Sequence, residues 1–182
     1  MRLLALLLVL VISACAREEE VTRVRVPKED APAAGAALGA RSGRPAETVR
    51  WSVPKGWKSL PASGMRLATM IPPGPGKAEL TIVSLPGEVG GELANANRWR
   101  GQLGLGPIDE RALAAGRRKT SSPAGQVAVY DFTSGDKKSR LVAGALSRGG
   151  TTWFIKLMGE EAAVAAALPG FEGLLESLHA AR

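Results

Sequence analysis

Apolar and polar residues alternate with a period of two in several short segments, which predicts β-strands. A first strand is expected at residues 48–53, and two more at residues 65–71 and 79–85, with a proline- and glycine-rich loop between these two. Three further strands, at residues 125–132, 139–146 and 151–158, are separated by Gly- and Asp-containing segments typical of hairpin turns. The pattern therefore predicts an antiparallel sheet of about six strands.

A helical period of about 3.6 residues appears in the segment between the two groups of strands. Residues 90–104 place four apolar side chains on one face of a helix, namely Leu93, Ala96, Trp99 and Leu103. Two glycines and a proline at residues 104–107 are a strong stop signal. We expect this helix to dock through its apolar face, with a short helix following at residues 109–115.

The last part of the chain, residues 159–181, also has a helical pattern. Pro169 is expected to open a second helical segment there, because a proline at the first helical position loses no hydrogen bond. Helices grouped with an antiparallel sheet define an α+β fold, in which helices sandwich the sheet.

The first 46 residues lack this periodicity and divide into two parts. Residues 1–14 carry Arg2 followed by an apolar run that is too short to span a bilayer, which predicts a signal peptide. Residues 15–46 are charged and then rich in Ala, Gly and Pro, which predicts a flexible tether. Residues 47–182 are then a single domain.

The end of the predicted signal peptide, Ile-Ser-Ala-Cys at residues 12–15, resembles the bacterial lipobox. This resemblance implies that Cys15 is acylated and anchors the mature chain in the cell membrane or outer membrane, with the domain on the extracytoplasmic side. Ordinary cleavage after Ala14 and an apolar start that is not cleaved are the alternatives. Cys15 is the only cysteine, so acylation would leave no thiol for a disulfide or for catalysis.

Charge and composition narrow the function classes. The chain has a net charge of +7, or about +6 without residues 1–14, and the basic residues are dispersed. Only 4% of the residues are aromatic, so we expect no binding of nucleic acid. The single histidine, His179, and the single cysteine leave no His/Cys metal site and no histidine base beside a nucleophile. The sequence predicts a protein without cofactor, metal or catalytic activity.

The helix at residues 90–104 carries the strongest candidate binding residues. Beside its apolar stripe, Asn95, Arg98 and Gln102 form a polar row whose donors and acceptors suit a carboxylate, a phosphate or a peptide backbone. The alternative is that this row ties the helix to nearby loops. Trp57 and Trp99 are the tryptophans expected at a binding rim, whereas Trp51 and Trp153 are expected in the core, although packing alone explains a tryptophan more often than function does.

Several segments resemble one known family. Residues 152–159, Thr-Trp-Phe-Ile-Lys-Leu-Met-Gly, and the helix after them resemble the end of PsbP-like domains, the superfamily of an extrinsic photosystem II protein. Residues 51–57, 65–69 and 95–102 resemble a group of bacterial lipoproteins that carry such a domain. The resemblance covers most of residues 47–179 and implies an antiparallel sheet between helical layers. It implies binding or assembly roles and no shared active site.

The leading hypothesis is a membrane-anchored, non-catalytic binding or assembly module of the bacterial cell envelope, with an envelope protein as a candidate partner. Its recognition surface would include the polar row and Trp57. One alternative is an envelope hydrolase that uses carboxylates near the central helix, which are Glu88, Glu92, Asp109 and Glu110. The other is a purely structural lipoprotein.

Overall fold

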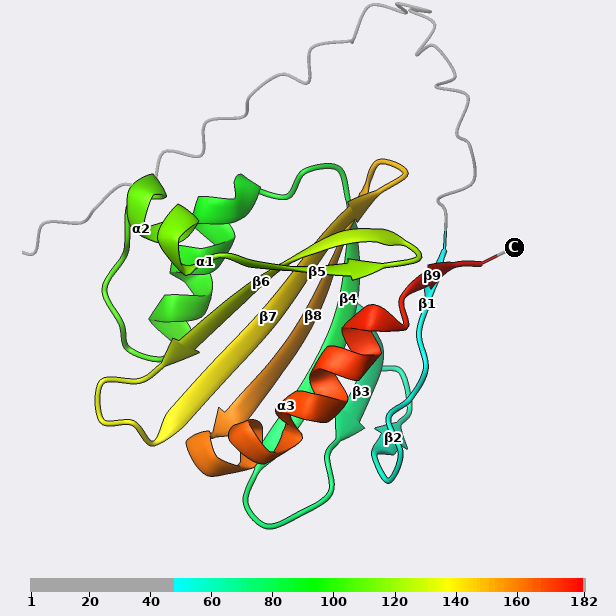
Figure 1. Ribbon diagram of the computed structural model, residues 1–182, viewed down its shortest axis with the longest axis horizontal. Coiled ribbons are helices and arrows are strands. Elements are labelled where there is room, and N and C mark those ends of the chain that lie inside the picture. Colours follow the sequence, from blue (N-terminus) through cyan, green and yellow to red (C-terminus); the bar gives the residue numbers. More distant parts are fainter. Residues whose placement is uncertain (1–47, 182) are drawn as a thin grey trace, which may run out of the picture. The chain divides into compact units, whose positions relative to one another are not determined.

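Seven strands form one antiparallel sheet in the computed structural model, which describes residues 48–181 (Figure 1). These strands are β2 (Lys58–Leu60), β3 (Arg66–Ile71), β4 (Ala78–Pro86), β5 (Arg118–Ser122), β6 (Gly125–Thr133), β7 (Ser139–Arg148) and β8 (Thr151–Glu160). Their order across the sheet is β2-β3-β4-β8-β7-β6-β5. The expected signal peptide, Cys15 and tether lie outside the described residues.

Three helices cover the two faces of this sheet. α3 (Glu161–Glu176) lies on one face, and α1 (Gly91–Gln102) and α2 (Glu110–Gly116) lie on the other (Figure 1). Successive residues of a strand point to opposite faces. Accordingly Ile155 of β8 joins the core under α3, and its neighbour Phe154 joins the core under α1. The predicted α+β sandwich is confirmed.

The two cores are closed to different degrees. The α3 side buries large apolar side chains, which include Leu80, Ile82, Leu146, Ile155, Leu157, Phe171, Leu174 and Leu175. Each of these is at most 1% exposed. The core under α1 has fewer fully buried residues and more half-buried ones, and it is on this side that the sheet carries a cavity, described below.

α3 continues through Pro169, so the expected break at this residue is wrong. The proline removes the hydrogen bond that its own N–H would have donated, and its ring crowds the carbonyl one turn earlier. Val164, Phe171 and Leu175 lie on one continuous buried stripe that spans the proline, and its burial favours one unbroken helix. Beside Pro169, Gly170 gives room for Trp57, because a Cβ atom on Gly170 would lie 2.8 Å from the indole Nε1.

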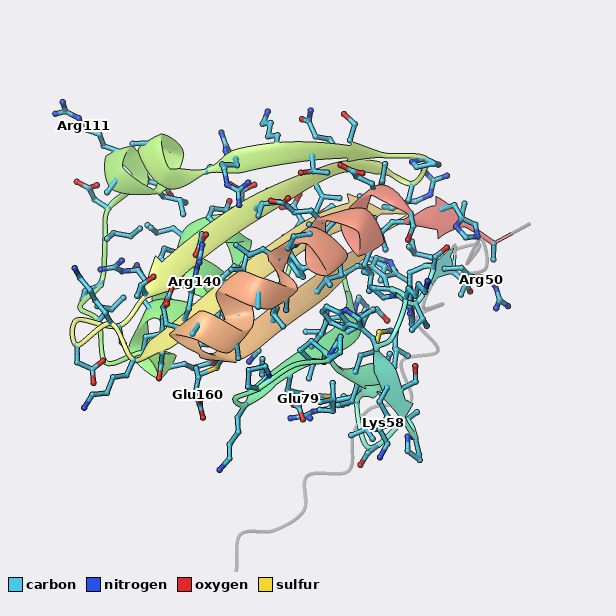
Figure 2. All side chains as sticks on the ribbon, turned by 60° about the horizontal axis from the view of Figure 1, so that its bottom comes forward. Arg50, Lys58, Glu79, Arg111, Arg140 and Glu160 are labelled. Carbon is cyan, nitrogen blue, oxygen red and sulfur yellow. The ribbon has the colours of Figure 1, made fainter. Side chains whose placement is uncertain are left out.

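The two edge strands were not expected from the sequence. β5 and β2 are short and polar, so neither shows the alternation that marks a half-buried strand. Both pair on one side only, β5 with β6 and β2 with β3. Lysine at an edge, such as Lys58 on β2, points into solvent and disfavours pairing with another chain (Figure 2).

The two ends of the domain pair with each other, which also departs from the expectation. β1 (Val49–Arg50) is shorter than the predicted strand at residues 48–53 and lies outside the large sheet. Its partner is β9 (His179–Ala180), where a helix was expected. Ser177 ends α3 and accepts a hydrogen bond from the Ser52 backbone at 2.9 Å, and Leu178 is 1% exposed. These contacts outweigh helix propensity at the end of the chain.

The close approach of β8 to the loop before β4 gives a prediction about Gly159. A Cβ atom on this residue would lie 2.1 Å from the carbonyl oxygen of Lys77, which is backbone and cannot rotate away. Gly159→Ala should therefore lower the free energy of unfolding by at least about 1–3 kcal/mol, as overpacking does. Chemical denaturation measures this loss.

Gly173→Ala is the matched control, because a Cβ atom there meets nothing within 4 Å. This glycine lies inside α3, so alanine should stabilise the protein by about 0.5–1 kcal/mol. Equal stability of the two variants would contradict the observed pairing of β4 and β8.

Candidate functional site

The start of α1 is fixed by a buried amide. Gly90 precedes the helix with a φ of 72°, a left-handed conformation that favours glycine, and no side chain caps the helix. Asn95 donates both amide hydrogens of its side chain, to the carbonyl oxygens of Val89 at 2.5 Å and Gly91 at 2.7 Å. Asn95 is 4% exposed, and its Oδ1 atom is buried without a hydrogen-bond partner in the described structure. One residue thus holds the loop against the helix.

The middle of α1 is fixed to the sheet by Trp99. Its ring centroid lies 5.8 Å from that of Tyr130 on β6 and 5.7 Å from that of Phe154 on β8. The contact with Phe154 is edge-to-face, at 81°, a favoured geometry for aromatic pairs. Trp99 is 5% exposed, so it packs in the core and not at an exposed rim, and it also lines the cavity described next.

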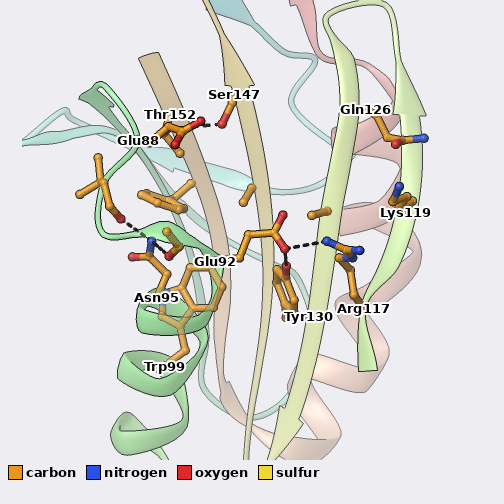
Figure 3. A pocket seen from close by; sticks show the side chains of 15 residues that line it. Glu88, Glu92, Asn95, Trp99, Arg117, Lys119, Gln126, Tyr130, Ser147 and Thr152 are labelled. Carbon is orange, nitrogen blue, oxygen red and sulfur yellow. Dashed lines mark hydrogen bonds and ion pairs between the residues drawn. The ribbon is translucent and has the colours of Figure 1, made fainter. Parts of the chain in front are cut away.

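A cavity of about 360 Å³ lies between the beginning of α1 and the sheet (Figure 3). Its volume is within the ~300–1,000 Å³ range of small-molecule sites. Its walls come from the loop before α1, from α1 and from the strands β5, β6, β7 and β8. The lining residues are Glu88, Val89, Gly91, Glu92, Asn95, Trp99, Arg117, Lys119, Gln126, Ala128, Tyr130, Ala145, Ser147, Thr152 and Phe154.

Glu92 bridges this cavity from the helix to the sheet. Its Oε2 atom accepts a hydrogen bond from the Tyr130 hydroxyl at 2.7 Å and one from the Arg117 guanidinium at 2.8 Å (Figure 3). Burial of Tyr130, followed by its hydrogen bond to the Glu92 carboxylate, raises the pKa of its phenol. The hydrogen bond and charge of Glu92 raise the pKa of Arg117. The three side chains form one charge-compensated unit, which we call the Glu92 bridge.

Opposite charges stand at the two ends of the cavity. Glu88 lies at the end near Thr152, and Lys119 lies at the end near Gln126 and β5 (Figure 3). The Thr152 hydroxyl donates to the carbonyl of Gly87 at 2.7 Å, which places this loop against β8. Glu88 and Lys119 are exposed, and neither forms an ion pair with another described residue. Both charges are free to meet a ligand.

The structure separates the residues of the expected recognition surface. Asn95 lines the cavity, whereas Arg98 and Gln102 do not. Gln102 is exposed and accepts a hydrogen bond from Lys156 at 3.0 Å, and Arg98 is exposed. Trp57 lies against α3, on the opposite face of the sheet from α1. The expectation that the polar row and Trp57 share one recognition surface is therefore wrong.

Two other polar residues of α1 hold the loop that follows it. Asn97 exchanges two hydrogen bonds with the backbone of Ile108, at 3.1 Å and 2.8 Å. Arg100 donates to the carbonyl of Gly106 at 2.8 Å, and its guanidinium lies 5.4 Å from the ring centroid of Phe132. These two residues thus fix the following loop to the helix. The alternative interpretation of the polar row expected contacts of this kind for the row, and not for Asn97 and Arg100.

Sequence reasoning missed Arg117, Lys119 and Tyr130 as cavity residues. Arg117 and Lys119 lie beside and on β5, a strand that the sequence does not predict, so their position facing α1 could not be derived. Tyr130 alternates with Val129 on β6, and this alternation was a usable signal for a face opposite α3. Nothing in the sequence pairs it with Glu92, which is 38 residues away.

A second groove, of about 560 Å³, lies on the other side of the molecule beside β1 and β9. Trp51, Leu67 and Trp153 give it a mainly apolar lining. Its charged and titratable side chains, Arg50 and His179, are exposed. This groove lacks the convergent polar groups of the cavity under α1, so the latter is the better candidate site.

Comparisons with known proteins found neither a matching family model nor a matching curated protein. Among solved structures, the chain is similar to a protein of Bacteroides thetaiotaomicron, with 9% identity, a TM-score of 0.46 and coverage of 74% of this chain. It is also similar to cyanobacterial PsbP of Synechocystis sp. PCC 6803, with 13% identity, a TM-score of 0.45 and coverage of 79% of this chain and 99% of that chain.

A third similar structure is LpqN of Mycobacterium tuberculosis, which is involved in cell envelope biogenesis. The identity is 14%, the TM-score is 0.43, and the likeness covers 77% of this chain and 87% of LpqN. This chain spans 45% of the length of the Bacteroides protein.

Within residues 48–181, no helix is long and apolar enough to cross a membrane. The same residues contain no group of three or more His, Cys, Asp or Glu side chains placed to hold a metal ion.

The Glu92 bridge predicts an unusual titration of Tyr130, which is the only tyrosine in the chain. The ultraviolet absorbance of tyrosinate therefore reports this residue alone. The folded protein should titrate well above the ordinary tyrosine pKa of 10.0, and the protein unfolded in urea should titrate near that value. Because the folded state holds the proton more tightly, stability should fall as the pH rises above 10.

Glu92→Gln should move the midpoint for Tyr130 toward the ordinary value, since the carboxylate is one of the causes of the raised pKa. The matched control is Glu110→Gln, a change in α2 outside the cavity. A folded-state midpoint near 10 in the unaltered protein would contradict the bridge.

Proposed function

We propose that this chain is a lipid-anchored, non-catalytic binding or assembly module of the bacterial cell envelope, and that it recognises its ligand in the cavity under α1. The observation that carries the proposal is the Glu92 bridge inside a cavity that still has free polar groups. The bridge supplies a rigid, charge-compensated wall, while Glu88 and Lys119 keep unpaired charges at the two ends. Preformed walls with a few orienting polar groups are what a binding site requires.

The anchor in this proposal is Cys15. The apolar run before it and the small residues at positions 13 and 14 support acylation, and residues 15–46 would join the lipid to the domain. We place the domain on the extracytoplasmic side of the cell membrane or outer membrane. LpqN, a structure similar to this chain, is named for involvement in cell envelope biogenesis, a setting that agrees with this placement.

The alternative of an envelope hydrolase is less well supported by the carboxylates near α1. Asp109 caps α2, since its Oδ1 atom accepts a hydrogen bond from the Ala112 backbone at 2.8 Å, and Glu110 does not line the cavity. The Oε2 atom of Glu92 already accepts hydrogen bonds from Arg117 and Tyr130, so this oxygen is not free to position a water molecule. Glu88 alone would remain, without the second carboxylate that paired acid–base hydrolysis uses.

A photo-crosslinking amino acid tests the recognition site without knowledge of the ligand. Placed at Gln126, which is exposed on the cavity wall, it should label an envelope component in living cells. Ala145→Phe, which fills the cavity floor, should abolish this labelling while the purified variant keeps a cooperative thermal transition. The same probe at exposed Lys55, outside the cavity, is the control and should give no such product.

Labelling at Gln126 that persists unchanged in the Ala145→Phe protein would contradict recognition in the cavity. Equal products from the probes at Gln126 and Lys55 would contradict it too.

The anchor is tested by Cys15→Ser. Because the hydroxyl of serine cannot replace the thiol in lipidation, this variant should leave the membrane fraction or accumulate unprocessed. Fractionation followed by mass spectrometry of the N-terminus measures both outcomes. A Cys15→Ser protein that is processed normally and stays in the membrane fraction would show that Cys15 is not the anchor.

A further inference from the structure

The charges at the two ends of the cavity under α1 have opposite sign. Glu88 offers a carboxylate beside β8, and Lys119 offers an ammonium group on β5 (Figure 3). Arg117 adds hydrogen-bond donors at this end, because its charge is compensated within the Glu92 bridge but only one of its N–H donors is bound to Glu92. A ligand that complements both ends carries a positive group at one end and a negative group at the other.

The spacing of the strands sets the length of such a ligand. β8 and β5 are separated by three strand spacings in the order β8-β7-β6-β5. At about 4.8 Å for each spacing, the two ends are about 14 Å apart. An extended peptide covers about 3.3–3.6 Å per residue, so about four residues reach from one end to the other. A free amino acid is too short to meet both charges.

The floor and wall between the two ends suit a peptide backbone. Ala128 and Ala145 leave the floor without large side chains, so a backbone can lie close to the sheet. The Ser147 hydroxyl and the Gln126 amide line the wall above the Glu92 bridge and can exchange hydrogen bonds with peptide groups (Figure 3). The volume of about 360 Å³ is at the small end of ligand sites, which favours small side chains on the ligand.

From these features we infer that the cavity binds a short peptide of about four small residues with both termini free, its ammonium group at Glu88 and its carboxylate at Lys119 and Arg117. This inference rests on the proposed function and names the ligand class of the same site. The peptide lies across the strands β8, β7, β6 and β5, on the side of the Glu92 bridge that holds Ser147 and Thr152.

Tetra-alanine is the probe that tests the inference, in titrations of the full chain followed by NMR chemical shifts. The free peptide should shift cavity resonances at concentrations up to about 10 mM, the range of weak contacts worth a few kcal/mol. N-acetylation or C-amidation, each of which removes one terminal charge, should weaken binding about twofold to fivefold, as the loss of one exposed ion pair does. Di-alanine, which cannot span the two ends of the cavity, should bind as weakly as tetra-alanine with one terminus blocked.

Removing a charge from the cavity should have an effect similar to removing the complementary charge from the peptide. Glu88→Gln should weaken free tetra-alanine as much as N-acetylation does, and it should bind the acetylated and free peptides equally. Lys119→Met should weaken free tetra-alanine less than C-amidation does, because Arg117 still faces the carboxylate, and it should reduce the difference in affinity between the amidated and free peptides. Glu110→Gln and Lys55→Met remove charges of the same signs at exposed positions outside the cavity and should leave all affinities unchanged.

The inference is overturned if the acetylated and amidated peptides bind the unaltered protein as well as the free one, or if the shifts lie outside the cavity. It is also overturned if no peptide binds. In that last case, labelling at Gln126 that Ala145→Phe abolishes would still support a binding module with another ligand. If neither peptide binding nor labelling at Gln126 that depends on the cavity is observed, the proposed recognition in the cavity is contradicted as well.

Discussion

The contact of Trp99 with Tyr130 and Phe154 decides where α1 lies, and the site depends on that position. α1 buries only Asn95, Ala96 and Trp99 fully, so a single large side chain provides most of its attachment to the sheet. Burial of an aromatic side chain of this size is worth several kcal/mol, which is more than the exposed polar contacts of the helix can supply. With the middle of the helix held at β6 and β8, its first turn reaches the sheet through the hydrogen bond between Glu92 and Tyr130, and the cavity lies beside this contact.

The gap beside this contact is the cavity under α1. On the other face α3 presents an unbroken apolar stripe, and the sheet beneath it is sealed. On the α1 face the strands carry Ala128, Ala145, Ser147 and Thr152 where larger apolar residues would have closed the core. The Glu92 bridge keeps the helix and the sheet in register across this gap. Small residues on the sheet and a charge-compensated bridge above them together maintain an open, polar cavity.

The elements with strong periodicity were predictable from the sequence, and those that rely on pairing alone were not. The long strands β6, β7 and β8 and the helix α1 carry enough alternating or helical pattern to reveal their type. The edge strand β5 has the sequence Arg-Lys-Thr-Ser-Ser, and only its hydrogen bonds to β6 make it a strand. Pro169 shows the opposite case, in which burial of a stripe keeps a helix intact through a residue that usually ends one.

The site was predictable only in part, again because some of its residues depend on pairing between strands. The sequence placed binding residues on the central helix, and of these Asn95 and Trp99 line the cavity, while Glu92 was named only as a carboxylate of the hydrolase alternative. The other half of the site comes from Arg117, Lys119 and Tyr130, which reach it through β5 and β6. Long-range pairing between strands brings them there, and one sequence does not encode that pairing in a local pattern. Trp57 was misplaced because no local feature shows which face of the sheet its turn covers.

The central claim is that Glu92 and Tyr130 are joined across the cavity in solution. A double-mutant cycle on the free energy of unfolding tests it, with Glu92→Gln, Tyr130→Phe and the double variant. Tyr130 is 2% exposed and donates to a charged acceptor, so the coupling energy should be about 1–2 kcal/mol. Effects of the two substitutions that add to within about 0.3 kcal/mol would contradict the bridge and the cavity that it spans.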